Sequence, residues 1–183
     1  MKLVPLIALS TVLAASLATA GAVNSPYAGQ HTRQVKALSS TDIESLLAGK
    51  GMGFAKPAEL NAYPGPLHVL ELAAPLQLSP AQRARTEALV APMQMQAKRV
   101  GALYVQQEAE LEQLFASGRI TPETLKAQLQ EIGVLHAELR RIHLETHIAQ
   151  KAILSPEQIA RYNRLRGYDA PAPDADRAHG HRH

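Results

Sequence analysis

Apolar residues recur at helical spacing through the second half of the chain, between charged and polar ones. A four-three spacing links Leu125, Leu129, Ile132, His136, Leu139, His143 and Thr146, and beside it lie Leu135, Ile142 and Ala149. From residue 80 to 116 the corresponding inward candidates are Leu89, Met93, Val100, Leu103, Leu111, Leu114 and Phe115. A period near 3.6 residues predicts amphipathic helices with one buried face. Two long helices are therefore expected, over 80–116 and 122–153.

Three similar start signals mark these helices and a shorter one after them. Each places a hydroxyl residue before a proline: Ser79-Pro80, Thr121-Pro122 and Ser155-Pro156. The hydroxyl can cap the helix, and proline at the first helical position has no N–H left unpaired. The short 117–121 connection makes the long helices antiparallel. The predicted fold is all-α: a long antiparallel hairpin with short flanking helices at 41–48, 66–74 and 156–166.

A single long hairpin with two short helices cannot cover both sides of its own apolar stripes. We therefore expect a homodimer, in which two subunits complete each other's apolar surface.

The first 22 residues are typical of a secretory signal peptide. Lys2 precedes an apolar run and a small-residue stretch that ends in Ala18-Thr19-Ala20 or Ala20-Gly21-Ala22. The alternative is an uncleaved membrane anchor, but Pro5 and several hydroxyl residues keep the apolar run below the about 20 residues that a span needs. The prediction is a cleaved signal over 1–22, a periplasmic location and no membrane span afterwards. There follow an irregular segment with a short helix (23–65), a helical domain (66–168) and a disordered tail (169–183).

The amino-acid composition excludes several kinds of protein and of functional site. The 183 residues contain no cysteine or tryptophan and only 4% aromatics, which excludes disulfide scaffolds, thiolate metal sites and cysteine nucleophiles. The net charge of +3 is spread over interspersed charges, so no basic surface for nucleic acid is indicated. No nucleotide loop or nucleophile motif is present, and we expect the protein not to be an enzyme.

Two copies of one motif suggest a family. Leu78-Ser79-Pro80-Ala81-Gln82 and Leu154-Ser155-Pro156-Glu157-Gln158 resemble the repeated Leu-Thr/Ser-x-x-Gln signature of the periplasmic Spy/CpxP-like chaperone and heavy-metal-resistance family. The resemblance covers 66–168, and 51–65 has no counterpart. It implies a helical hairpin that dimerises into a cradle. It also implies one of three activities: an ATP-independent chaperone for unfolded envelope proteins, an adaptor for a stress-signalling protein, or a metal-binding sensor or resistance factor.

Histidines are the candidate metal ligands. His143 and His147 stand at i and i+4 on one helix face, a spacing that lets two imidazoles reach one ion. His136 lies two turns earlier. In metal-binding members further ligands come from the amino-terminal segment, so the resemblance points to His31, Glu59 or His68. No cofactor is required, but zinc, nickel, cobalt or copper would suit these ligands. The alternative is that the histidines only pack at the edge of the core.

Two other groups of residues are candidates for binding. The tail histidines His179, His181 and His183 can chelate divalent cations, or they form a solvated or artificial end. Cationic and flexible apolar residues on the hairpin could hold unfolded clients: Met93, Met95, Lys98, Arg99, Val100, Leu103, Arg140 and Arg141. The alternative is an ordinary solvated helix face. The leading hypothesis is a chaperone or stress adaptor, and the second is a metal-binding sensor or resistance protein.

Overall fold

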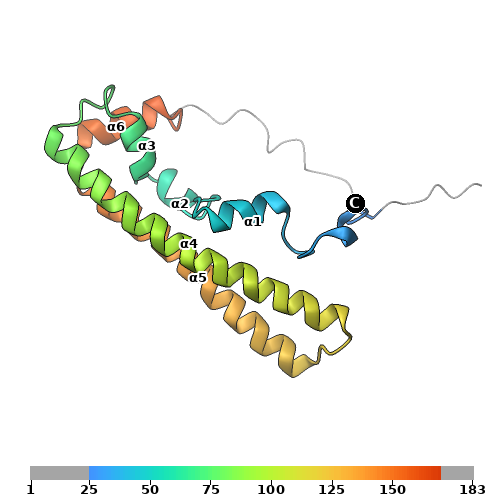
Figure 1. Ribbon diagram of the computed structural model, residues 1–183. Helices are drawn as coiled ribbons and strands as arrows, with labels where there is room; N and C mark the ends of the chain where they lie inside the picture. Colours follow the sequence, from blue (N-terminus) through green and yellow to red (C-terminus); the bar gives the residue numbers. More distant parts are fainter. Residues whose placement is uncertain (1–24, 170–183) are drawn as a thin grey trace, which may run out of the picture. The chain divides into compact units, whose positions relative to one another are not determined.

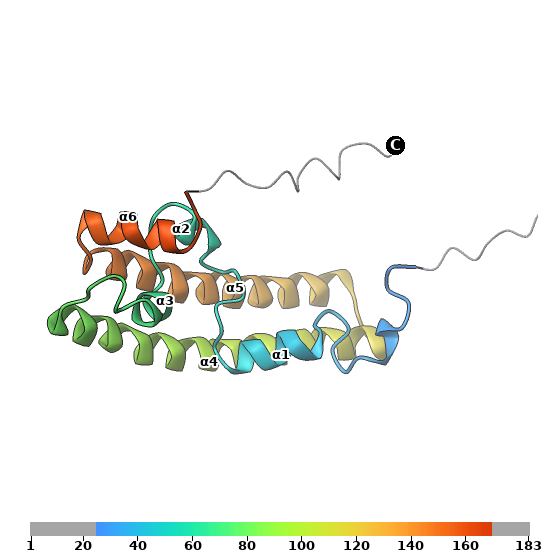
Figure 2. The same ribbon diagram turned by 90° about the horizontal axis from the view of Figure 1, so that it is seen from above.

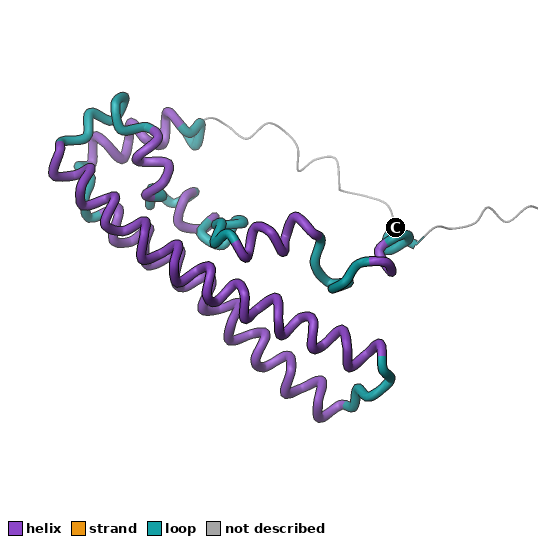
Figure 3. Tube along the Cα trace, viewed as in Figure 1, coloured by secondary structure: helices purple, strands orange, loops and turns teal. Residues whose placement is uncertain are grey.

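A computed structural model describes residues 25–169, so the predicted signal peptide and the tail histidines lie outside the described residues. The chain divides into two compact units at residue 31. Residues 25–31 hold a turn and the start of the short 3-10 helix η1 (Gln30–Thr32). The second unit holds six α-helices, and within 25–169 no strand is present, which confirms the all-α class (Figure 3).

The second unit is built on a hairpin of two long helices. Helix α4 (Pro80–Ala116) and helix α5 (Pro122–Lys151) run antiparallel and lie side by side in both views (Figures 1 and 2). Both begin as predicted, because the Ser79 and Thr121 side chains each accept a hydrogen bond from the backbone amide three residues later. The hairpin predicted from the sequence is confirmed.

Short helices pack along one side of this hairpin. Helix α1 (Ser40–Leu47) contacts α4, helix α2 (Lys56–Glu59) contacts α5, and helix α3 (Pro66–Glu71) contacts both. After α5 the chain turns back into α6 (Pro156–Leu165), which lies near α2 and α3 in Figure 2. Residues 32–65 are therefore part of the same compact unit as the hairpin.

Glycine at position 101 lets α1 approach α4 closely. A β-carbon built on Gly101 would lie 2.3 Å from the carbonyl oxygen of Leu46, at the carboxyl end of α1. No side chain fits at that distance, so the docking of α1 depends on a residue without one. This contact anchors the segment that leads into residues 49–65.

The buried face of α5 is rotated from the predicted stripe. Ile132 and Leu139 are buried as expected, together with Leu135 and Ile142 from the neighbouring line. Leu129, however, is 50% exposed, and His136 is also exposed, so their predicted place in the seam is wrong. On α4 the predicted inward residues Leu103 and Phe115 are exposed as well.

The packing of α5 on α4 explains this rotation. Helix α5 packs mainly on α4, so the line of residues nearest α4, which includes Leu135 and Ile142, is covered, while Leu129 and His136 lie to one side of that line. Near the hairpin turn, α5 packs on α4 without a third helix, and more apolar surface stays open there. The homodimer that would cover such surface stays a prediction.

Candidate functional site

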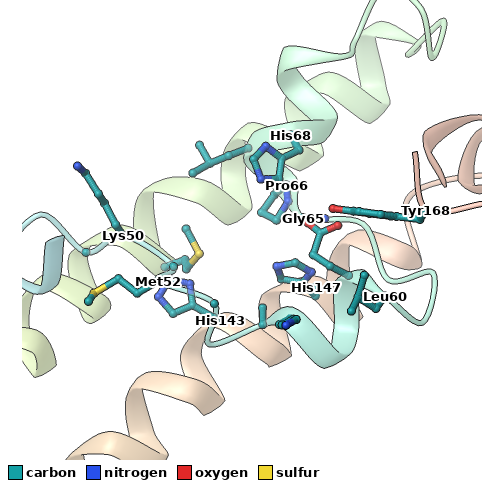
Figure 4. A pocket seen from close by; sticks show the side chains of 17 residues that line it. Lys50, Met52, Leu60, Gly65, Pro66, His68, His143, His147 and Tyr168 are labelled. Atoms are coloured by element: carbon teal, nitrogen blue, oxygen red, sulfur yellow. Dashed lines mark hydrogen bonds between the residues drawn. The ribbon is translucent and has the colours of Figure 1, made fainter. Parts of the chain in front are cut away.

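A cavity of about 430 Å³ opens where residues 49–68 cross the hairpin. Its walls come from the loop after α1, from α2 and α3, and from the middle of α4 and the carboxyl half of α5 (Figure 4). The lining residues with chemistry of interest are Met52, Glu59, His68, Met93, His143, His147 and Tyr168. The cavity thus joins the predicted histidine pair to the segment before residue 66.

His147 is held in one tautomer. Its Nδ1 lies 2.8 Å from the backbone carbonyl oxygen of Tyr63, and a carbonyl can only accept a hydrogen bond, so Nδ1 carries the proton and donates it. In the neutral imidazole the lone pair is then on Nε2. The ring is only 7% exposed, so its orientation is well restrained. A histidine fixed through one nitrogen in this way is the usual form of a metal ligand.

Glu59 is the carboxylate of the cavity and is held by two donors. The backbone N–H of Gly65 donates to its Oε1 at 3.2 Å, and the hydroxyl of Tyr162 lies 3.0 Å from Oε1 and 2.9 Å from Oε2. Tyr162 is fully buried on α6. Burial, followed by the negative charge of Glu59, raises the pKa of Tyr162, so this hydroxyl remains a donor.

The Glu59 carboxylate and the free nitrogen of His147 converge above Gly65. A β-carbon on residue 65 would lie 2.7 Å from Glu59 Oε1 and 3.2 Å from His147 Nε2. Only glycine leaves that space open, because any side chain would collide with both groups. An acceptor oxygen and an acceptor nitrogen therefore face one small volume at this end of the cavity.

His143 lies toward the other end of the cavity. In Figure 4 it is on the side of Lys50 and Met52, whereas His147, Gly65 and Tyr168 lie on the opposite side. His143 is 4% exposed, and its Nε2 is buried without a hydrogen-bond partner. Burial, and then the neighbouring His147, hold its pKa below the ordinary value. The lowered pKa favours the neutral imidazole, and its Nε2 has no hydrogen-bond partner.

The structure separates the predicted histidines. His143 and His147 both line the cavity, as does His68, whose Nδ1 lies 2.9 Å from Glu71 Oε2.

His136 does not line the cavity. Its ring packs on Phe54, with centroids 5.5 Å apart, and Phe54 also stacks on His143. His31 belongs to the other unit. Within residues 25–169, no three His, Asp or Glu side chains gather closely enough to surround one ion.

The predicted client-binding residues divide between core and surface. Met93 and Val100 are buried in the hairpin core with Leu139 and Ile142, so they form no outer surface of this subunit. The others are exposed: Met95, Lys98, Arg99, Leu103, Arg140 and Arg141. Arg141 forms ion pairs with Glu138 and Glu145 on its own helix.

Several residues of the site were not found from the sequence. Tyr162, Gly65 and the carbonyl of Tyr63 hold the two ligand candidates, yet Tyr162 is 103 residues from Glu59 and no periodicity links them. Met52, which lines the cavity, was not among the predicted site residues, and Met93 was predicted both as an inward residue of its helix and as a client-binding residue. The one available signal was the breaker-rich sequence Pro64-Gly65-Pro66, which marks a backbone that lies close to something else.

Comparison with known families bears on the same part of the chain. A family model described as heavy-metal resistance matches residues 50–161, well over half of the chain. The chain belongs to the heavy-metal resistance family. This family has the Spy/CpxP-like helical fold, which agrees with the hairpin. Its match begins at residue 50 and so includes the 51–65 segment that the motif comparison left without a counterpart. No curated protein and no solved structure matches the chain.

The residues of this family member fit a transition metal in their chemistry. One imidazole with a fixed tautomer and one hydrogen-bonded carboxylate face the same space, and a second, buried imidazole has an unused nitrogen. Nitrogen and oxygen donors of this kind suit zinc, nickel, cobalt and divalent copper. Between residues 25 and 169, no helix of this family member has the length and hydropathy to cross a membrane.

Proposed function

We propose that this heavy-metal resistance protein binds a divalent transition-metal ion at the Glu59–His147 end of its cavity. The observation that carries the proposal is the convergence of Glu59 Oε1 and His147 Nε2 on the space above Gly65. A cation in that space would interact favourably with the carboxylate and with the lone pair of the imidazole nitrogen. The predicted export to the periplasm would expose the site to metal ions from outside the cell.

The two residues would supply part of the coordination shell. His147 would bind through Nε2, with its Nδ1–H retained by Tyr63, and Glu59 would bind through Oε1 while Tyr162 and Gly65 keep their hydrogen bonds. Water would fill the remaining positions. Such a site suits sensing or buffering, because an ion bound by few protein ligands exchanges readily.

Calorimetric titration with Co²⁺, Ni²⁺ and Zn²⁺ tests this function. The full chain is used with His179, His181 and His183 changed to Gln, so that the tail cannot bind. We expect one ion per chain, and an affinity at least about tenfold lower in His147→Gln and in Glu59→Gln. With Co²⁺ the visible absorption of the bound ion gives a second readout.

His136→Gln is the matched control, since it removes an exposed imidazole of the same helix that does not line the cavity. It should bind as the parent does. The proposal is wrong if the parent binds none of the three ions, or if the His147 variant binds as tightly as the His136 variant.

A second candidate function is the holding of unfolded envelope proteins, with or without a stress-signalling partner. It is favoured by exposed apolar residues beside cations on α4: Met95 is 68% exposed and Leu103 40%, close in sequence to Lys98 and Arg99. Flexible side chains of this kind adapt to many partners.

Light scattering of a chemically denatured client protein tests this candidate. An equimolar amount of the protein should suppress aggregation, and Met95→Ser with Leu103→Ser should suppress it less. Gln106→Ser, an exposed change on the same helix, is the control. Unchanged scattering with the parent protein would exclude chaperone action on that client.

A further inference from the structure

The cavity has an apolar lining that the chain itself leaves partly open to water. The apolar lining residues include Met52, Leu60, Pro66, Leu67 and Met93. Met52 and Leu67 are each 41% exposed, and Leu60 is 56% exposed. Because these three side chains both line the cavity and reach solvent, they stand at its opening. An apolar group bound there would remove their surface from water, which is favourable.

The Glu59–His147 end of the same cavity offers two hydrogen-bond acceptors. Glu59 accepts from the Gly65 N–H and the Tyr162 hydroxyl, and it forms no ion pair with any residue between 25 and 169. The charge of Arg166 acts on Glu59, but its guanidinium donates to the hydroxyl of Tyr168. A carboxylate has about four lone-pair positions, so Glu59 can accept further hydrogen bonds.

A primary ammonium group matches these acceptors. Its three N–H donors are on one nitrogen atom, and Glu59 Oε1 and His147 Nε2 lie close to one point beside Gly65. A hydrogen bond from an ammonium group to a carboxylate is charge-assisted and therefore strong. A ligand carboxylate would be repelled by Glu59, and an uncharged apolar group would leave both acceptors without a partner.

We infer that the cavity binds a small amphiphilic amine, with its ammonium group at Glu59 and His147 and an unbranched apolar tail against the apolar lining. In Figure 4 Met52 lies on the side opposite Gly65, so the two parts of such a ligand would lie at the two sides of the cavity. The volume of about 430 Å³ is typical of small-molecule pockets. This ligand class goes beyond the metal ion of the proposed function and does not require it.

Two lysines also line the cavity, and they do not favour an anionic ligand inside it. Lys50 and Lys56 are both exposed, so water solvates their ammonium groups. In Figure 4 the Lys50 side chain extends away from Met52 and His143. Their effect is measured directly by including an anionic ligand in the test.

Three ligands with the same six-carbon tail test the inference: hexylamine, hexanol and hexanoate. Each is titrated into the full chain, labelled with ¹³C-methyl methionine and kept metal-free by a chelator. Met52 and Met93 line the cavity, whereas Met95 is 68% exposed and does not line it. Hexylamine should shift the methyl signals of Met52 and Met93 but not that of Met95. Its Kd should be at least about tenfold below that of hexanol, and hexanoate should bind more weakly than hexanol.

Two variants separate the contribution of the head group from that of the tail. Glu59→Gln keeps an oxygen that can accept from Tyr162 but removes the charge, so the preference for hexylamine over hexanol should fall by about tenfold while hexanol binds as before. Leu60→Ser should weaken the binding of both ligands. Leu129→Ser is the matched control, because it changes a leucine that is 50% exposed and does not line the cavity.

The length and the source of the tail are tested with two further amines. Butylamine has two methylenes fewer than hexylamine and should bind about tenfold more weakly, because each methylene in contact with the lining contributes to affinity. The side chain of Nα-acetyllysine methylamide carries the same ammonium group, but its two amides fit an apolar lining poorly, so it should also bind more weakly than hexylamine. Equal binding would assign the site to a lysine of a partner protein and overturn the inference.

Amine binding and metal binding are judged by separate titrations. Unshifted Met52 and Met93 signals, equal affinities for hexylamine and hexanol, or an unchanged preference in Glu59→Gln would each overturn the inference. If hexylamine fails while Co²⁺ binds, only the inference is wrong. If hexylamine binds as expected while no divalent ion does, the inference stands and the proposed metal site is wrong.

Discussion

The side-chain amides of Gln82 and Gln158 pair with each other across 76 residues of sequence. Gln82 Nε2 donates to Gln158 Oε1 at 2.7 Å, and Gln158 Nε2 donates to Gln82 Oε1 at 3.1 Å. Each glutamine is also the third helical residue after a capping serine and accepts from that serine's backbone N–H. The starts of α4 and α6 are thus joined by the last residues of the two similar motifs.

Removing one amide of this pair should destabilise the protein. In Gln82→Ala the Gln158 amide and the carbonyl of Ile153 each lose a partner in a partly buried place. We expect the free energy of unfolding in urea to fall by about 1–3 kcal/mol. Gln106→Ala is the control, because its amide bonds only to Glu110 on the exposed face of the same helix. Equal losses in the two variants would show that the pairing of the motifs contributes nothing.

The buried face of α5 is tested by two isoleucines. Ile132 is 8% exposed in the hairpin and Ile148 is 58% exposed. Ile132→Ala should lower the unfolding free energy by about 2–5 kcal/mol, because it leaves a cavity in the core. Ile148→Ala, the same change on the same helix, should cost much less, about 0.5 kcal/mol. Thermal melting of both proteins measures the difference, and a melting temperature unmoved by Ile132→Ala would place that residue outside the core.

Tyr162 should act on the divalent ion through Glu59. Tyr162→Phe keeps the ring in its cluster with Val69 and Leu76 but removes the hydroxyl that holds the carboxylate. We expect the affinity for Co²⁺ to fall by about 10–100-fold, the usual effect of losing such a supporting hydrogen bond.

Tyr168→Phe provides the comparison for that change. Tyr168 lines the cavity, but its hydroxyl accepts a hydrogen bond from Arg166 and forms none with Glu59. Its Co²⁺ affinity should match that of the parent. If the Tyr162 variant also binds Co²⁺ as tightly as the parent, Glu59 does not depend on the Tyr162 hydroxyl.

The metal-free protein should lose stability as the pH falls below about 6.5. Burial holds the pKa of His143 below its unfolded value of about 6.5, so between the two pKa values the unfolded chain binds more protons than the folded one. The neutral His143 ring contributes fully to the unfolding free energy above the unfolded pKa. This contribution is lost as the pH falls towards the folded pKa. Melting temperatures from pH 8 to pH 5, with chelator present, measure it.

The slope of that profile should be shallower in His143→Gln, whatever its absolute stability. His136→Gln removes an exposed histidine of the same helix and should keep the parent slope. Parallel profiles for the parent and the His143 variant would show that His143 titrates alike in the folded and unfolded chains.

The order and ends of the long helices were determined by local sequence. Capping serine and threonine, proline at the first helical position and glycine after the last are signals read within one turn, so α4, α5 and α6 begin where predicted. The all-α class followed from the spacing of apolar residues at a period near 3.6. The placing of His143 and His147 on one helix face also followed, because a four-residue spacing on a helix leaves no other arrangement.

Tertiary packing decided the rotation of α5 and the composition of the cavity. The sequence could not show that Leu129 is exposed, because Leu129 fits the apolar spacing and only the position of α4 decides which side of that stripe is covered. Nor could it bring Glu59 to His147 or Tyr162 to Glu59, since those contacts depend on how an irregular segment crosses the hairpin. Local rules act over a few residues, whereas these groups are separated by 84 to 103 residues and meet only when apolar surfaces are buried together.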